Sequence, residues 1–135
     1  MPGSADNPNS SLWAKAFQEA FEALRWIDGR NVKMEYRWGD NADVQRAHAQ
    51  ELAGLNLDVI FAGAASSLIR LKAATQTTPI VFANVADPVA LGFVDSLARP
   101  SGNITGFANY EQSVGAKWLE LLKQIAPRVS RTLFI

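Results

Sequence analysis

The segment from Pro79 to Phe107 constrains the fold of this chain more than any other part of it. Residues 80–83 form a nearly continuous apolar run, which is typical of a parallel strand covered on both faces by helices. The pair Asp87–Pro88 then resembles a helix start, so we expect a helix over 88–98 and a second strand over 103–107. A polar turn at the carboxyl end of a buried parallel strand is a common ligand position in open α/β sheets. The segment therefore predicts both an α/β fold and a place on it for a ligand.

The rest of the chain alternates between helical and strand patterns, which predicts a three-layer, doubly wound and mostly parallel sheet. From Leu12 onward apolar residues recur every three or four positions, in a helix that Ser10 or Ser11 can cap and Gly29 can end. Further helices are expected over 42–54, from the turn at 63–67 to about 76, and from 114 until Pro127. Short apolar strands are expected over 58–62 and 132–135, and the polar residues 1–11 are expected to be flexible.

Residues 32–38 change to a period of two. Apolar and aromatic side chains occupy one face, and charged side chains occupy the other, as in Val32, Met34, Tyr36 and Trp38 against Lys33, Glu35 and Arg37. This alternation predicts a half-buried strand at the edge of the sheet.

Composition excludes several classes of function. A chain of 135 residues suits one domain, and its 13 basic residues balance 13 acidic ones, so its charge favours neither nucleic acid nor an anionic membrane as a partner. Cysteine is absent, which excludes thiol catalysis, disulfides and cysteine-ligated metals. The first residues lack a basic segment followed by an apolar run, so we expect no signal peptide and, for the chain as written, a cytoplasmic location.

The small residues between 63 and 67 form the first candidate site. Backbone N–H groups and the helix dipole at a strand-to-helix turn favour an anion such as a carboxylate, with Ala65, Ser66 and Ser67 nearest to it. The alternative is that Ser66 or Ser67 only caps its helix. A nucleophilic serine is disfavoured, because the G-x-S-x-G pattern is missing and the one histidine is distant in sequence.

Two further candidates follow the later strands. Asn84 has no local structural duty and is therefore the better ligand candidate, whereas Asp87 can simply cap the helix that Pro88 opens. Asn109 and Tyr110 follow the last strand, where an amide and a phenol could bond to a polar ligand or stack on an aromatic one. The alternative for this second pair is an ordinary loop that leads into a helix.

Other notable residues favour structure over chemistry. His48 falls on the inward side of its helix, and a lone histidine there is more often packed than catalytic. The four tryptophans lie mostly on apolar stripes and are expected in the core. No pattern indicates a metal or a dinucleotide, so we expect no cofactor and no enzyme activity.

An ordered set of short motifs now indicates a family. The set comprises Gly29-Arg30-Asn31-Val32, Tyr36-Arg37-Trp38, Asp58-Val59-Ile60, Pro79-Ile80-Val81-Phe82, Asp87-Pro88-Val89, Ser96-Leu97-Ala98-Arg99-Pro100, Gly102-Asn103-Ile104-Thr105-Gly106 and Lys117-Trp118-Leu119-Glu120-Leu121-Leu122-Lys123. From about Ala16 to Ile135, the chain resembles the bacterial ABC-transporter substrate-binding proteins of the tryptophan/tyrosine-binding type.

The resemblance implies one lobe of a type I periplasmic-binding-protein fold, which closes with a second lobe on a small solute, often an amino acid, and delivers it to a membrane permease. It implies a periplasmic location and ligand contacts from the 65–67 turn, the 84–87 turn and the region of Asn109. Residues 12–110 would form lobe one, and 111–135 would begin lobe two. Family members also have an export signal and a first strand, neither of which this chain shows, and Ala64 replaces a frequent hydroxyl residue.

The strand count leads to an expectation about assembly. The absent first strand would lie between 32–38 and 58–62, so we expect Thr132–Ile135, or a strand of another copy, to occupy that position. The apolar face of the helix within 111–126 is likewise expected to be buried in a homo-oligomer. Two other hypotheses stay open: a cytoplasmic flavodoxin-like sensor or enzyme domain, and a fragment without a function of its own.

Overall fold

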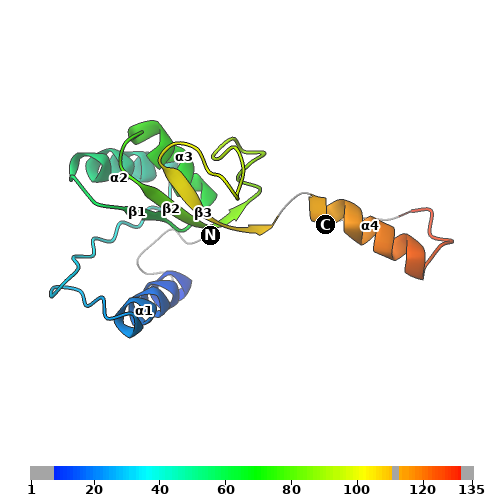
Figure 1. The fold of residues 1–135 in the computed structure, drawn as a ribbon, viewed down its shortest axis with the longest axis horizontal. Helices are drawn as coiled ribbons and strands as arrows, with labels where there is room; N and C mark the ends of the chain where they lie inside the picture. The colour runs from blue at the N-terminus through cyan, green and yellow to red at the C-terminus, as the bar shows by residue number, and fades with distance from the viewer. Residues whose placement is uncertain (1–7, 111–112, 132–135) are drawn as a thin grey trace.

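A three-stranded parallel sheet forms the centre of the computed structural model, which describes residues 8–110 and 113–131 (Figure 1). Its strands are β1 (Ile60–Ala62), β2 (Ile80–Ala86) and β3 (Ile104–Tyr110), in the order β1-β2-β3. In the register, Ile60 pairs with Ile80 and Ile80 pairs with Ile104. The predicted parallel α/β fold is therefore confirmed.

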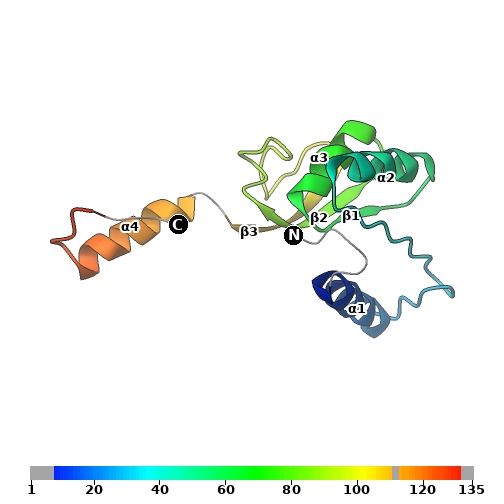
Figure 2. The same cartoon turned by 180° about the vertical axis from the view of Figure 1, so that it is seen from behind.

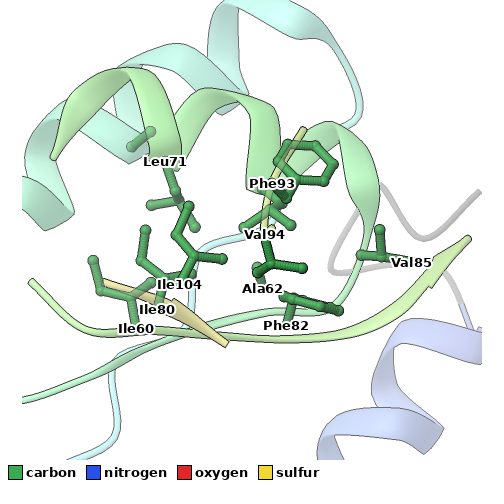
Figure 3. Close-up of a cluster of buried hydrophobic side chains, with 11 residues drawn as sticks. Ile60, Ala62, Leu71, Ile80, Phe82, Val85, Phe93, Val94 and Ile104 are labelled. Atoms are coloured by element: carbon green, nitrogen blue, oxygen red, sulfur yellow. The ribbon is translucent and has the colours of Figure 1, made fainter. Parts of the chain in front are cut away.

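Two helices cover one face of this sheet. Helix α2 (Ala42–Gly54) begins as predicted, because the Asn41 side chain accepts hydrogen bonds from the N–H groups of Asp43 and Val44 at 3.1 and 3.0 Å. Helix α3 (Ala65–Ala74) connects β1 to β2. We call the side of the sheet under these helices the covered face; its buried side chains are Ile60, Ala62, Ile80, Phe82, Val85 and Ile104, which meet Leu68 and Leu71 of α3 (Figure 3).

The opposite side of the sheet is more exposed. We call it the open face, and its side chains are Phe61, Val81 and Phe107, of which Phe107 is 76% exposed and Phe61 47%. Helix α1 (Pro8–Ala23) lies on this side, and its Phe17 ring contacts the Phe61 ring at a centroid distance of 4.8 Å (Figures 1 and 2). In the part of the chain that the structure describes, helices thus bury one face of the strands, and the other face is only partly covered.

Residues 32–38 do not form the predicted strand. These residues form no ladder of backbone hydrogen bonds with the sheet. Their one strand-like contact is an isolated bridge between Asp28 and Val32. The guanidinium of Arg37 instead anchors this segment to α2 through Glu51, with nitrogen–oxygen distances of 2.7–3.2 Å. An alternating pattern forms a strand only when a neighbouring edge is within hydrogen-bonding reach, and here β1 is separated from the segment by a groove.

Helix α1 differs from the prediction at both ends. It begins at Pro8, so Ser10 and Ser11 lie inside it and cannot be its N-cap, and residues 8–11 belong to it. It ends at Ala23, and Arg25 then adopts a left-handed backbone with φ of 65°. Gly29 belongs to a later turn, in which its N–H donates to the carbonyl of Val32 at 2.9 Å.

The predicted helix over 88–98 is also absent. Only about one turn forms after Pro88, in which Leu91 N–H donates to Asp87 O and Phe93 N–H donates to Pro88 O. Gly92 then takes a positive φ of 69°, and Phe93 and Val94 turn together into the core. Burial of two adjacent apolar side chains in one core overrides the helix signal.

The carboxyl-terminal helix α4 (Ser113–Ile125) matches its prediction and projects away from the sheet beyond β3 (Figure 1). Its apolar side chains are largely exposed, as are three of the four tryptophans, so the prediction of tryptophans in the core is wrong for Trp13, Trp26 and Trp118. The predicted strand over 132–135 lies outside the described residues. The boundary near residue 110 between two lobes stays a prediction.

Candidate ligand-binding site

An amide pair stands at the carboxyl edge of the sheet. The side-chain nitrogen of Asn109 donates to Oδ1 of Asn84 at 2.7 Å. Both residues belong to strands, Asn84 to β2 and Asn109 to β3, and do not follow them as predicted. The other amide groups of this exposed pair remain available to hydrogen-bond a polar ligand.

A β-bulge positions the first member of this pair. The pairing of β2 with β3 shifts register between Phe82 and Val85, and Asn84 within the shift has a φ of +57°. Asparagine tolerates this left-handed conformation better than most residues, and bulges often re-aim a side chain beside a functional site. The sequence singled out Asn84 as a ligand candidate, but no pattern in it indicated the bulge.

Asp87 acts locally, as its alternative interpretation held. Its Oδ1 accepts a hydrogen bond from the N–H of Ala90 at 3.1 Å, in the turn that the buried Pro88 opens. Its backbone φ is +43°, so Asp87 is a second left-handed residue, three positions after Asn84. The carboxylate therefore shapes the loop beside Asn84, and a direct ligand contact by Asp87 stays a prediction.

The first turn of α3 lies at the same edge of the sheet, since it follows β1. Its N-cap position is Ala64, which makes no side-chain hydrogen bond to the helix, so neither Ser66 nor Ser67 is the cap. The first N–H groups of the helix consequently donate no hydrogen bond to the side chain of the N-cap residue. Ser66 is exposed, whereas Ser67 lies in the wall of a groove described below.

The topology therefore gathers all the predicted site residues at one edge of the sheet, because the carboxyl ends of parallel strands coincide. Contact is shown for Asn84 and Asn109. Tyr110 is the last residue of β3 and pairs with Ala86, and its side chain lies outside the described residues. The roles of all the predicted site residues in ligand binding stay predictions.

A larger hollow, which the sequence did not indicate as a site, lies beside β1. We call it the β1 groove; it has a volume of about 600 Å³ and lies between α1, residues 32–39, α2 and the outer edge of β1. Mostly apolar and aromatic side chains line it, among them Trp13, Phe17, Phe21, Tyr36, Trp38 and Phe61. A smaller polar hollow of about 340 Å³ lies at the opposite end, by the carboxyl end of α3 and the amino end of β3.

His48 forms part of the wall of the β1 groove, and its Nδ1 is buried without a hydrogen-bond partner. The rim of the groove carries an ion-pair chain from Lys33 through Glu35 and Arg37 to Glu51. Hydrogen bonds from Arg37 lower the pKa of the Glu51 carboxyl, and those from Lys33 and Arg37 lower the pKa of Glu35. Burial raises the pKa of Tyr36, whose ring stacks on that of Trp38 at 6.3 Å.

The described residues, 8–110 and 113–131, hold no group of three or more histidine, aspartate or glutamate side chains placed to bind a metal ion. Within the same ranges no helix is both long and apolar enough to span a bilayer.

Comparison with known sequences identifies the family. The sequence profile of the ABC transporter substrate binding protein family matches residues 6–135. The chain belongs to this family. Among curated proteins, the tyrosine-binding protein of Clostridioides difficile (strain R20291) is 31% identical over 127 residues, which cover 93% of this chain and 36% of that protein.

Solved structures agree on the fold of this substrate-binding family member. A ligand-free, open substrate-binding protein with adhesive properties from Clostridium difficile matches with a TM-score of 0.73 and 30% identity, over 91% of this chain and 41% of that one. A conserved domain protein from Vibrio cholerae matches with a TM-score of 0.70 and 30% identity, over 85% of this chain and 38% of that one. An ABC domain in complex with L-Trp from Streptococcus pneumonia matches in fold, with a TM-score of 0.72 and 23% identity, over 92% of this chain and 41% of that one. The chain therefore spans about two fifths of these relatives, which corresponds to one lobe.

Proposed function

We propose that this chain is a truncated substrate-binding component of an ABC-type transporter and supplies one wall of an interlobe cleft for a small solute. The observation that carries the proposal is the hydrogen-bonded pair of Asn84 and Asn109, which a β-bulge holds at the carboxyl edge of the sheet. Ligands of open α/β sheets bind at this edge. The chain would bind its solute and hand it on without a reaction, as substrate-binding relatives do.

An amino acid is the solute class that fits best. The first turn of α3 offers N–H groups without a side-chain cap, which suits a carboxylate, and the amide pair suits a polar ligand group. Two relatives are described by an aromatic amino acid, tyrosine in one and L-Trp in the other. The neutral Asn109 supplies no charge for an ammonium group, so the full site needs groups from a facing lobe.

The remaining parts of the proposal follow from the family. The partner would be an ABC permease, and the working location of a full-length relative would be the periplasm or the outer side of the membrane. We also propose a homo-oligomer, because the β1 groove and the apolar face of α4 are exposed in a single copy. Trp118, Leu121 and Ile125 are among the exposed apolar side chains of that helix.

The test is a titration of isotope-labelled protein with L-tyrosine and L-tryptophan, followed by amide chemical shifts. One wall of a cleft should bind weakly, with a Kd of roughly 1 mM or above, and the shifts should cluster at Asn84, Asn109 and the first turn of α3. Asn84→Ala should abolish these shifts. Gln50→Ala removes an exposed amide from α2, away from this edge, and should leave them intact.

Two results would contradict the proposal. Shifts that cluster elsewhere, or that persist unchanged in Asn84→Ala, would remove this edge as the site. A response to nucleotides or flavins but to none of the twenty amino acids would instead favour a sensor or enzyme domain.

A further inference from the structure

Strand pairing and a buried neighbour hold the amide pair of Asn84 and Asn109 in place. Val85, the residue after Asn84, is fully buried and pairs with Ala108, the residue before Asn109. The two asparagine backbones are therefore fixed next to each other, and the hydrogen bond of 2.7 Å fixes their side chains. A polar pair that is ordered before a ligand arrives can select the ligand by its pattern of donors and acceptors.

The hydrogen bond within the pair determines which polar atoms face a ligand. The Nδ2 of Asn109 donates to the Oδ1 of Asn84, which leaves the Nδ2 of Asn84 and the Oδ1 of Asn109 for other partners. The first of these atoms can only donate, and the second can only accept. Because both residues are exposed, the pair presents a donor and an acceptor next to each other.

Few ligand groups satisfy both atoms at once. A carboxylate accepts but cannot donate, and an ammonium group donates but cannot accept, so each would leave one atom of the pair without a partner. An apolar group would leave both atoms without a partner. A carboxamide or a hydroxyl group donates and accepts, and it therefore matches the amide pair.

The charge at this edge of the sheet favours the same groups. Within residues 63–66, 83–87 and 107–110, Asp87 is the one charged residue, and its Oδ1 already accepts a hydrogen bond from the N–H of Ala90. The amide pair itself is neutral. A charged ligand group placed on the pair would lose hydration without an opposite charge to offset the loss, whereas a neutral group loses less.

The position of the pair assigns it to the side chain of an amino acid. Helix α3 follows β1, and β2 and β3 are the next strands of the sheet. Because neighbouring strands lie about 5 Å apart, a carboxylate at the first turn of α3 would be about 5–10 Å from the pair. The α-ammonium group stands on the carbon next to the carboxylate and cannot reach that far, but an extended side chain can.

We propose that the Asn84–Asn109 pair selects amino acids whose side chain ends in a neutral group that both donates and accepts a hydrogen bond. Carboxamide and hydroxyl side chains fulfil this condition; apolar, anionic and cationic side chains do not. The inference rests on the proposed function and narrows its solute class. The selectivity belongs to this wall of the cleft, so it is measurable in this chain.

The side-chain NH2 signals of Asn84 and Asn109 in isotope-labelled protein report the contact directly. L-Glutamine should shift these signals at neutral pH. L-Methionine and L-glutamate have side chains of similar length and should bind several-fold more weakly, up to about tenfold, because they lack one or both of the hydrogen bonds. L-Tyrosine should exceed L-phenylalanine by a similar factor, since the two differ by one hydroxyl group.

The variant Asn109→Asp tests the pattern with little change of shape. It replaces the amide N–H groups by a charged oxygen, so position 109 can then only accept. L-Glutamine should bind more weakly and L-lysine more tightly, and the ratio of their Kd values should change about tenfold. Gln50→Glu makes the same exchange on an exposed part of α2 and should leave the ratio unchanged.

The outcomes separate this inference from the proposed function. Equal affinities for L-glutamine, L-methionine and L-glutamate, with shifts at this edge for all three, would overturn the selectivity and leave the proposed function standing. An Asn109→Asp protein with an unchanged ratio for L-glutamine and L-lysine would overturn it as well. If none of the twenty amino acids shifts signals at this edge, the proposed function fails, and the inference fails with it.

Discussion

The two faces of the same three strands differ sharply in burial. On the covered face Phe82 and Ile80 are fully buried beneath α3, whereas on the open face Phe107 is 76% exposed. Both sets of side chains are apolar, so the strands themselves offer similar surfaces. The difference arises from the elements that lie against each face. Helices α2 and α3 cover one face, and α1 contacts the other through the rings of Phe17 and Phe61.

The contrast shows which part of this chain is self-sufficient. The unit from α2 to β3 builds a core from elements that are adjacent in sequence, which is efficient because local contacts cost little chain entropy. The open face, the β1 groove and α4 retain apolar surface that calls for further contacts. The following predictions test this division, beginning with the largest effect.

Gly106→Val should prevent folding of the covered core. A Cβ at residue 106 would overlap the backbone and the ring of Phe82, and the φ of +158° is itself unfavourable for valine. We expect a loss of about 4 kcal/mol or more of unfolding free energy, measured by urea denaturation with circular dichroism. Gly54→Ala is the control, because nothing lies within 4 Å of its added Cβ at the end of α2. A normally folded Gly106→Val protein would contradict the described pairing of β2 with β3.

Phe82→Ala and Phe107→Ala compare the two faces at matched chemistry. Phe82 is fully buried, so its truncation should cost about 3–5 kcal/mol of unfolding free energy. Truncation of the exposed Phe107 should change it by about 0.5 kcal/mol or less. Similar losses in both variants would show that the open face is covered in solution.

The contact between α1 and the open face should be measurable as a coupling. A double-mutant cycle of Phe17→Ala and Phe61→Ala should give about 0.5–1.5 kcal/mol, as expected for an aromatic pair. Leu12→Ala with Phe61→Ala is the control, since Leu12 is 61% exposed and should show no coupling. A zero value for the first cycle would mean that α1 does not hold this position.

The smallest effect concerns the ion pair between Arg37 and Glu51. The folded-state pKa of Glu51 lies below its ordinary value of 4.5, so its contribution is present above that pH and is lost as the pH falls through the lowered value. Acidification should therefore lower the amide protection factors, which correct for the slower intrinsic exchange at low pH, in residues 33–38 more than in β2. Arg37→Gln should remove that extra acid sensitivity, and an unchanged pH profile in the variant would contradict it. High salt should weaken the pair at neutral pH as well.

Local signals predicted much of this fold. The cap at Asn41 fixed the start of α2, and the apolar run at 80–83 located β2 in a parallel sheet. The wrong predictions depended on contacts between distant parts of the chain. Residues 32–38 needed an adjacent strand edge to form a strand, and burial of Phe93 and Val94 in the core replaced the helix expected there. The site was partly predictable, because strand ends attract polar residues, but the contact of Asn84 with Asn109 depends on a bulge.

The bulge at Asn84 divides β2 into two stretches. Even-numbered residues such as Phe82 point to the covered face before the bulge, and the odd-numbered Val85 does so after it. Phe82 and Val85 are an odd number of positions apart, yet both are fully buried on the covered face. In a regular strand residues three apart would face opposite ways, so the extra residue reverses which positions point inward. The length of the chain between Phe82 and Val85 is therefore as constrained as its composition. Loss or gain of one residue there would exchange inside for outside in the end of the strand that presents the amide pair.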